Sequence, residues 1–333
     1  MARALSEDEL LRLVDALASG EWRSGEALAA EAGVTRAALA KRVGHLRDWG
    51  LEVEAEAGRG YRLAQPLRRL SAERIRALLP ADRSLRALEV LARTDSTNQR
   101  LLEADAARDP QALFAELQTA GRGRRGRQWR SPFGANLYLS LGWSFPAWPP
   151  QLSALSLAVG VAGARALRRA GLGEVMLKWP NDLRVGDDKL GGILIEQRGE
   201  AGGACRVVIG IGINVAMSEA QAGELGQPWI SLNTALARGG QPAPERNALA
   251  AGLLGELLAA LERFQAEGFA PFLVDWAALD LTANRPVRIE GAGEPLLGVA
   301  RGVDAQGALI VEAQGRRHHV HSGEVSLRLG GAP

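Results

Sequence analysis

The sequence has few of the features on which disulfide-rich and membrane-spanning proteins depend. Its 333 residues include one cysteine, Cys205, which excludes an internal disulfide framework and suits a reducing compartment. The most apolar long stretch, residues 152–167, is short and contains Arg165, so it does not predict a membrane span. The N-terminal stretch has no apolar signal core. We therefore expect a cytoplasmic protein with no membrane partner.

The overall charge does not identify a partner either. The net charge is +2, so any binding of nucleic acid has to come from local clusters of charge. A hydrophobic content of 47% and a charged content of 23% are ordinary globular values. At roughly 150 residues per domain the length predicts two or three domains. Shifts in pattern place them at residues 1–64, 67–282 and 283–330.

Residues 1–64 predict a winged helix-turn-helix DNA-binding domain. A capping box at residues 6–9 opens the first helix, and a basic third helix follows Thr35. Two alternating segments, 51–55 and 61–63, then form a hairpin. The predicted DNA contacts are the cap and exposed cations of the third helix and the tip of the hairpin: Thr35, Arg36, Lys41, Arg42 and Arg59.

The acidic residues of this segment leave a second interpretation open. It carries 9 Lys/Arg and 11 Asp/Glu, a net charge of −2, and Glu52, Glu54 and Glu56 place acid on the wing. A small helical domain that docks another protein would show such a charged face. We favour DNA because the basic residues concentrate on the helix that geometry places in the major groove.

Residues 67–282 predict an α+β domain with helices on one side of a sheet. Strands are expected at 88–91, 112–118, 136–143, 175–177, 183–185, 189–197 and 206–209, and the main helices at 152–170 and 245–264. After residue 285 only short strands follow, which predict a small β-barrel. The polar segment 95–98 (DSTN) follows the first of these strands. It can cap a helix or bind a small ligand.

The most informative stretch is the arginine loop, residues 121–129 (GRGRRGRQW). Three glycines free its backbone, and four arginines indicate an anionic ligand, because guanidinium groups match carboxylate and phosphate oxygens. Gly121, Gly123 and Gly126 match a dinucleotide fingerprint by letter, but a strand rather than a helix follows, so we reject that assignment. The chain has no Gly-Lys-Ser/Thr and hence no Walker loop.

A second cluster lies at residues 178–182 (KWPND), where a cation, an indole, an amide and a carboxylate converge at a turn. Each of these residues alone can be explained by capping or burial. Lys189 follows at the start of a mostly apolar strand, where a lysine needs an anionic partner or a path to solvent.

Four motifs in this order resemble those of biotin–protein ligases: GRGRRGRQW at 121–129, KWPND at 178–182, KLGGI at 189–193 and GIGIN at 210–214. The DSTN segment and the small C-terminal β domain extend the resemblance to nearly the whole chain. The winged segment is similar to the bifunctional type, in which a ligase also represses the biotin operon. The resemblance implies a central mixed α/β ligase domain with helices on a β-sheet and an SH3-like C-terminal barrel.

The resemblance also implies a two-step reaction. Biotin and ATP form biotinyl-5′-adenylate with loss of pyrophosphate, and a lysine of a biotin carboxyl carrier protein then takes the biotin. Biotin, ATP and Mg²⁺ are the expected small molecules, with no metal site of the protein's own. Cations in a water-poor site would bring the two anionic substrates together.

Site residues follow from the motif positions. The biotin site is expected at Ser96, Thr97, Asn98, Gln118, Arg122, Gly123, Arg124 and Lys189. The adenylate or ATP site is expected at Arg124, Arg125, Arg127, Trp129, Asn181 and Asn214. Lys189, Arg124 and Asp182 are the catalytic candidates, with Asp182 either helping a metal ion or orienting the acceptor amine.

Two other functions compete with a ligase that is also a repressor. One is a ligase whose winged domain does not bind DNA, and the other is a non-catalytic repressor that senses a small acid. For repression we expect the adenylate to order the arginine loop, the central domains to pair, and a homodimer to bind a palindromic operator. His318, His319 and His321 lack a nearby Cys or acid cluster, and we interpret them as surface residues.

Overall fold

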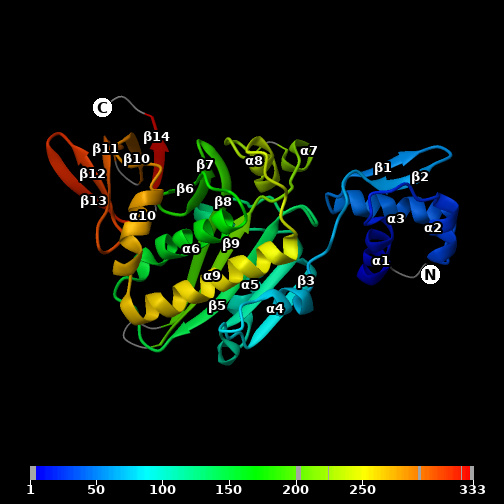
Figure 1. Cartoon of the computed structure of the whole chain (residues 1–333), viewed down its shortest axis with the longest axis horizontal. Helices are drawn as coiled ribbons and strands as arrows, with labels where there is room; N and C mark the ends of the chain where they lie inside the picture. The colour runs from blue at the N-terminus through cyan, green and yellow to red at the C-terminus, as the bar shows by residue number, and fades with distance from the viewer. Residues whose placement is uncertain (1–4, 200–203, 224, 292–293, 324, 331–333) are drawn as a thin grey trace.

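The computed structural model describes residues 5–199, 204–223, 225–291, 294–323 and 325–330. Its three parts lie in a row, with the N-terminal helices and hairpin at one end, a large sheet in the middle and a small sheet at the other end (Figure 1).

The N-terminal part is the winged helix-turn-helix arrangement that the sequence predicts. It consists of α1 (Glu7–Leu17), α2 (Gly25–Glu31), α3 (Arg36–Asp48), β1 (Val53–Glu56) and β2 (Gly60–Leu63). Ser6 and Glu9 form the predicted capping box, and the Thr35 hydroxyl caps α3. Leu39, Val43 and Leu46 are buried, so one stripe of α3 faces the core.

The central sheet has the strand order β3-β4-β5-β9-β8-β7-β6. β3 and β4 are parallel, and the other neighbours are antiparallel. The strands are β3 (Ala87–Thr94), β4 (Gln111–Gln118), β5 (Leu137–Phe145), β6 (Val175–Lys178), β7 (Asp182–Val185), β8 (Asp188–Gly199) and β9 (Cys205–Ile213).

Helices cover both faces of this sheet, so the prediction of helices on one side is wrong. α6 (Leu155–Arg169) and α9 (Arg246–Glu267) pack on the face that bears Val207 and Ile209, in the main core. α5 (Thr97–Glu103) packs on the opposite face, which bears Val208. Successive residues of a strand point to opposite faces, and the polar segment before α5 did not reveal which face the helix would take.

The remaining helices are short. They are α4 (Ala72–Leu78), α7 (Glu219–Ala222), α8 (Leu232–Arg238) and α10 (Leu273–Leu279), with single turns of 3₁₀ helix at Ala106–Arg108, Arg124–Gly126, Leu152–Ala154 and Ala270–Phe272. Sequence analysis missed α7 and α8, although Ser218 and Ser231 cap them. It also ended β9 too early, because residues 210–213 continue the strand despite two glycines.

A buried ion pair joins three segments at the N-terminal end of α9. Glu116 on β4 is 1% exposed and lies 2.7 Å from the Arg246 guanidinium, which also donates to the Asn136 carbonyl at 3.0 Å. The backbone N–H of Leu70 donates to the other oxygen of Glu116. Glu116 therefore fixes the segment that enters the central part from the N-terminal part.

We predict that Glu116→Ala destabilises the protein by about 3–5 kcal/mol, since it leaves the Arg246 charge buried without a partner. Urea denaturation of the full chain measures this. Glu312→Ala, which breaks the exposed pair with Arg301, is the control and should cost less than about 1 kcal/mol. Equal losses for the two variants would contradict the role of Glu116.

The C-terminal part is an antiparallel sheet in the order β13-β12-β11-β10-β14. Its strands are β10 (Pro286–Glu290), β11 (Leu296–Val303), β12 (Leu309–Ala313), β13 (Arg316–Val320) and β14 (Ser326–Leu329). The indole N–H of Trp179 donates to the Gly307 carbonyl at 3.2 Å, which connects this sheet to the KWPND turn.

The N-terminal part contacts the centre through the residues that follow the arginine loop. The Trp49 and Phe133 rings stack with centroids 5.1 Å apart, and the Phe133 N–H donates to the Trp49 carbonyl at 2.9 Å. Gly50 has φ +85°, and a Cβ there would lie 2.9 Å from Pro132. The end of α3 thus lies against the segment that carries the loop.

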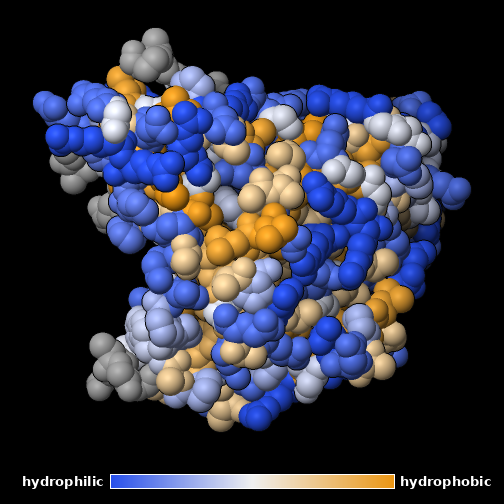
Figure 2. Space-filling model, turned by 60° about the vertical axis from the view of Figure 1, so that its left-hand side comes forward, coloured by the Kyte–Doolittle hydropathy of each residue, from blue (hydrophilic) through white to orange (hydrophobic). Residues whose placement is uncertain are grey.

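The surface on the C-terminal side is mainly hydrophilic, with apolar side chains gathered near the middle of the view (Figure 2). Within the described ranges no helix is both long enough and apolar enough to cross a membrane.

Candidate functional site

A pocket of about 430 Å³ opens on the sheet face that carries α5. Its walls come from the start of α5, the arginine loop, β8, β9 and the segment that follows α7. The pocket brings together residues far apart in sequence: Ser96, Thr97, Asn98, Gln118, Arg122, Gly123, Arg124, Arg127, Trp129, Asn181, Lys189 and Asn214 all line it.

One end of the pocket, here the polar end, is built from neutral hydrogen-bonding groups. Gln118 accepts from the Thr97 backbone N–H at 2.9 Å and donates to the Ser131 hydroxyl at 3.1 Å. Ser96 caps α5 through its hydroxyl. These contacts fix the orientation of the Gln118 amide, so the polar end is preorganised for a ligand that carries both donors and acceptors.

Asn98 supports this end through three hydrogen bonds within the protein. Its amide NH₂ donates to the Leu194 carbonyl at 3.2 Å and to Glu196 at 2.9 Å, and its oxygen accepts from the Ser140 hydroxyl at 2.5 Å. A Cβ on Gly210 would lie 2.4 Å from that oxygen, so the strand needs glycine there. Asn98 lines the pocket and supports its polar end, while its predicted contact with biotin stays a prediction.

Trp129 lies across two strand glycines in the middle of the pocket. A Cβ on Gly212 would lie 2.5–2.7 Å from its indole atoms, and one on Gly192 would lie 3.3 Å from the ring. The indole N–H is buried without a partner among the described residues. The glycines of the KLGGI and GIGIN motifs thus provide a flat floor for an aromatic ring.

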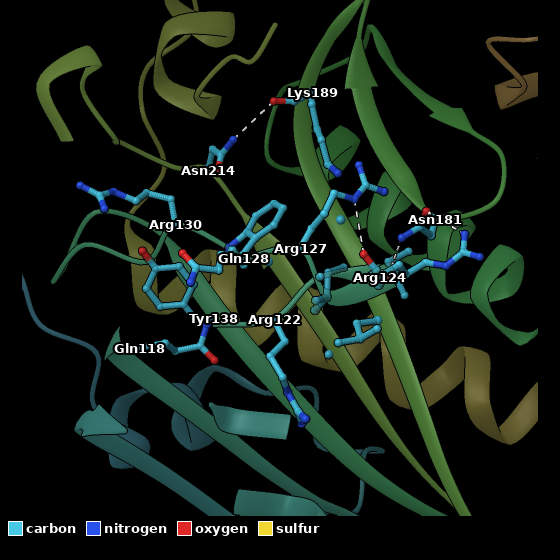
Figure 3. Close-up of a pocket in the computed structure, with 18 of the residues that line it drawn as sticks. Gln118, Arg122, Arg124, Arg127, Gln128, Arg130, Tyr138, Asn181, Lys189 and Asn214 are labelled. Atoms are coloured by element: carbon cyan, nitrogen blue, oxygen red, sulfur yellow. Dashed lines mark hydrogen bonds between the residues drawn. The ribbon is translucent and has the colours of Figure 1, made fainter. Parts of the chain in front are cut away.

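The other end, here the cationic end, gathers positive charge around one carboxylate. Lys189 is 8% exposed, its Nζ lies 2.7 Å from Asp182 Oδ1, and it stands 5.5 Å from the centre of the Trp129 ring. Figure 3 shows the Lys189 and Arg127 side chains converging, with Arg124 beside Asn181. Asp182 does not line the pocket itself and acts on it through Lys189.

Arg124 is held at this end by contacts to a second part of the chain. Its guanidinium donates to the Ser322 carbonyl, to the Gly323 carbonyl at 2.7 Å and to the Asn181 amide oxygen at 3.5 Å. Burial and the nearby charge of Arg127 lower the pKa of Arg124. Both effects disfavour the positive charge, so an anion placed between the two guanidiniums would be stabilised.

Arg125 takes no part in the pocket, which corrects its assignment as an adenylate contact. It has φ +58°, is exposed at the outer turn of the loop, and does not line the cavity. In that tight turn the backbone reverses, so neighbouring side chains point in different directions. The sequence alone did not show which of the consecutive arginines faces inward.

Lys178 is a second lysine close to the cationic end. Burial, reinforced by the charge of Arg184, lowers the pKa of Lys178 from 10.5 to about 8. The sequence has three lysines, Lys41, Lys178 and Lys189, so the reactivity of each can be followed by mass spectrometry.

We predict that acetylation of Lys178 by brief pulses of acetic anhydride rises through about pH 8 and levels off by about pH 9.5, because the amine is protonated below its pKa and neutral above it. Exposed Lys41 in the same sample is the internal reference. Labelling of Lys178 that still rises steeply above about pH 10 would contradict the lowered pKa.

Comparisons with known proteins agree with this geometry. The model of the Biotin/lipoate A/B protein ligase family matches residues 90–214, that of the Biotin protein ligase C terminal domain matches 282–328, and an HTH domain matches 10–62. The chain is 44% identical to the bifunctional ligase/repressor BirA of Escherichia coli over 96% of this chain and 97% of that relative. The chain is a member of the bifunctional ligase/repressor family. The resemblance inferred from the motifs is confirmed.

Two further similarities support the membership. The bifunctional ligase/repressor BirA of Bacillus subtilis is 30% identical over 93% of this chain and 95% of its own length. A solved biotin protein ligase from Aquifex aeolicus, in complex with biotin and ATP, has a TM-score of 0.61 and 27% identity, and covers 74% of this chain and 100% of its own.

In this bifunctional ligase/repressor, the cations of α3 are divided between solvent and the interior. The cations Arg36 and Lys41 are exposed, as is the cap residue Thr35. Arg42 instead pairs with Glu9 at 2.8 Å and is largely buried, so its assignment as a phosphate contact is corrected. Its position on α3 places it over the first turn of α1 rather than on the outer face.

The wing acids are each engaged within the molecule. Glu54 pairs with Arg62 at 2.7 Å and Glu56 with Arg59 at 3.0 Å, while Glu52 accepts from the Ser218 hydroxyl. Arg59 also lies 4.5 Å over the Trp22 ring. The wing therefore presents paired charges rather than a free acidic patch.

Several pocket residues of this family member were missed by sequence analysis. They are Gln128, Arg130, Tyr138, Leu139, Gly192, Ile193, Leu194, Gly210, Ile211, Gly212, Met217, Leu225, Gly226, Gln227, Trp229 and Arg328. Gly192, Gly210 and Gly212 carried a signal, because glycines inside a strand indicate a close approach. Arg328 lies in the C-terminal sheet, and nothing in its local sequence connects it to the pocket.

The histidines remain outside the pocket. His319 pairs with Asp304 at 2.7 Å on an exposed strand, and the described residues contain no group of three or more His, Cys, Asp or Glu side chains that would hold a metal ion.

Proposed function

We propose that this protein is an ATP-dependent biotin–protein ligase that also represses transcription in response to its own biotinyl-5′-adenylate. The observation that carries the proposal is one pocket with a neutral polar end and a cationic end, joined by an indole on a glycine floor. The E. coli and B. subtilis relatives, which are named as bifunctional ligase/repressors, match nearly the whole chain.

In the first step the ureido ring of biotin occupies the polar end, with Ser96, Thr97 and Gln118 as its partners. The biotin carboxylate then lies at the cationic end beside Lys189, Arg124 and Arg127. A carboxylate oxygen attacks the α-phosphorus of ATP, the bond to the bridging oxygen breaks, and pyrophosphate leaves. The cations offset the repulsion between the two anions and stabilise the charge on the phosphorus centre.

Trp129 supports both halves of the product. Its indole lies against Gly192 and Gly212, so one face covers the aliphatic tail of biotin and the edge is available to the adenine. Asn181 and Asn214, which line the same pocket, serve as polar neighbours of the nucleotide.

In the second step the neutral amine of an acceptor lysine attacks the acyl carbon of the mixed anhydride. The C–N bond forms, the acyl C–O bond of the anhydride breaks, AMP leaves with the bridging oxygen, and the amine gives up one proton to solvent. Asp182, held 2.7 Å from Lys189, is the carboxylate near the reacting centre and would orient the incoming amine. The acceptor is a biotin carboxyl carrier domain.

Mg²⁺ fits this site as an ion carried by ATP. A bound Mg²⁺ keeps several waters and takes one or two carboxylates plus substrate phosphates. Asp182, which pairs with Lys189, would be the carboxylate nearest to such an ion, and the ion would supply charge neutralisation at the phosphates.

Incubation of the full chain with ATP, Mg²⁺, biotin and a carrier domain tests the ligase. We expect the carrier to gain the mass of one biotinyl group and to gain none when lipoate replaces biotin. No gain with biotin would leave a repressor that senses a small acid. A gel shift with the upstream biotin-synthesis operator, with and without adenylate, separates the bifunctional protein from a ligase alone.

We predict that Arg36→Ala combined with Lys41→Ala weakens operator binding by about 10- to 100-fold. The slope of the logarithm of the binding constant against the logarithm of the salt concentration should become shallower by about one for each phosphate contact that is lost. The ligase rate should not change. Arg12→Ala on α1, also exposed, is the matched control. Unaltered operator affinity in the double variant would remove α3 as the recognition helix.

A further inference from the structure

We propose that Glu196 is a positioning residue that holds the arginine loop across the pocket through Arg122. It would thereby set how long the bound acyl-adenylate is retained; this last step rests on the proposed function. Glu196 lies on β8, outside every motif that pointed to the site.

The Glu196 carboxylate joins the arginine loop to the polar end of the pocket. One oxygen, Oε2, accepts from the Arg122 guanidinium at 3.0 Å and from the Asn98 amide at 2.9 Å. Asn98 in turn holds Ser140, whose hydroxyl lies 2.7 Å from that of Thr97 at the polar end. The loop is therefore linked through one carboxylate to residues that surround the ligand.

The Arg122 side chain points away from the cationic end of the pocket. In Figure 3 its side chain runs from the loop in a different direction from Arg124 and Arg127, which lie near Lys189. Its guanidinium meets Glu196 instead. Arg122 still lines the pocket, so its predicted contact with biotin stays a prediction, and the ion pair with Glu196 gives its guanidinium a role in holding the loop.

Two tethers then flank Gly123. On one side Arg122 is bound to Glu196 of the central sheet, and on the other Arg124 is bound to the Ser322 and Gly323 carbonyls of the C-terminal part. A glycine between two fixed points lets the backbone bend over a ligand without moving either anchor. Loss of the Glu196 tether would free the half of the loop that covers the polar end.

Two other positive side chains on β8 and β9 have partners elsewhere. Arg206 on β9, which is paired in the sheet with Arg198 on β8, forms an ion pair with Asp109 at 3.0 Å. Lys189, on the same strand, pairs with Asp182. Among the described residues, Arg122 is the cation within ion-pair distance of Glu196; the two side chains are 38% and 27% exposed, so their attraction is moderate.

The test compares Glu196→Gln with the parent and with Glu312→Gln. The glutamine oxygen still accepts from the Asn98 amide, so the contact that supports the polar end is retained while the charge that holds Arg122 is removed. Glu312 pairs with Arg301 at the same distance, 3.0 Å, and with similar exposure, but in the C-terminal sheet away from the loop.

The first readout uses the ligand-free full chain and brief trypsin digestion, with cleavage at residues 122–127 followed by mass spectrometry. Glu196→Gln should speed cleavage by about fivefold, the effect of losing a partly exposed ion pair. Glu312→Gln should stay within about twofold of the parent. Equal cleavage rates for parent and Glu196→Gln would overturn the tether.

The second readout is dissociation of preformed biotinyl-adenylate. We expect release to be about fivefold faster in Glu196→Gln, with the single-turnover rate of adenylate formation at saturating biotin and ATP changed by less than about twofold. Adding Arg122→Gln should produce no further change, because the same contact is already lost. Faster cleavage with unchanged release would overturn the link to ligand retention. Failure of the parent to form adenylate would overturn the proposed function, while the trypsin result would still decide the tether.

Discussion

Lys189→Met should lower the rate of biotinyl-adenylate formation by about 100- to 1,000-fold, the usual effect of removing a group that stabilises transition-state charge. Lys189 is the buried amine at the cationic end, on a strand of the sheet, whereas Arg124 and Arg127 come from the loop. Single-turnover formation of adenylate from biotin and ATP measures the effect.

This substitution also leaves the partly buried Asp182 with fewer partners, so a loss of rate has to be separated from a loss of fold. The double variant Lys189→Met with Asp182→Asn removes both charges and is the control. It should regain most of the thermal stability but none of the rate. A single variant that is stable and retains more than a tenth of the parent rate would remove Lys189 from the reaction.

Gly212→Ala should weaken binding of biotin and ATP by about 10- to 100-fold, because overpacking costs about 1–3 kcal/mol and here it displaces a ring that the ligand needs. The added methyl would lie 2.5 Å from the Trp129 indole, and the rigid sheet below leaves it no room to withdraw. Titration calorimetry of the full chain gives the affinities.

Gly252→Ala provides the matched control, since a Cβ there has no heavy atom within 4 Å. In the middle of α9 it should stabilise the protein by about 0.5–1 kcal/mol and leave ligand binding unchanged. Parent-like affinity in Gly212→Ala would show that Trp129 does not have to lie on the strand.

The elements and the pocket residues were predictable to different degrees, for physical reasons. Strong local signals, such as the Ser6–Glu9 capping box and the hydrophobic stripe of α3, were read correctly. The face that α5 covers was not, because the side of a sheet on which a helix packs depends on chain path and not on the helix's own residues.

Within the site, charge identified the arginine loop but not the direction of each side chain. The turn at Arg125 sends that residue to solvent, and Arg42 and Arg122 are bound by Glu9 and Glu196. These carboxylates lie 33 and 74 positions away from their partners, so no local pattern predicts the pairs. Residues contributed by the C-terminal sheet, such as Arg328, were missed for the same reason.

The contact between α3 and the segment after the loop gives a route by which ligand binding could affect the DNA-binding end. Trp49 caps α3 and stacks on Phe133, which follows the arginine loop by four residues. We propose that a change in the arginine loop on ligand binding acts on the base of α3 through this contact.

The central claim is that one pocket holds a biotin carboxylate and a nucleotide α-phosphate together. Its most direct test is to mix the full chain with biotin, ATP and Mg²⁺ in the absence of any acceptor and to analyse the protein-bound fraction by mass spectrometry. We predict one equivalent of biotinyl-5′-adenylate per chain, formed with release of pyrophosphate and lost in Lys189→Met. Bound biotin and ATP that stay separate in the parent protein would contradict the account.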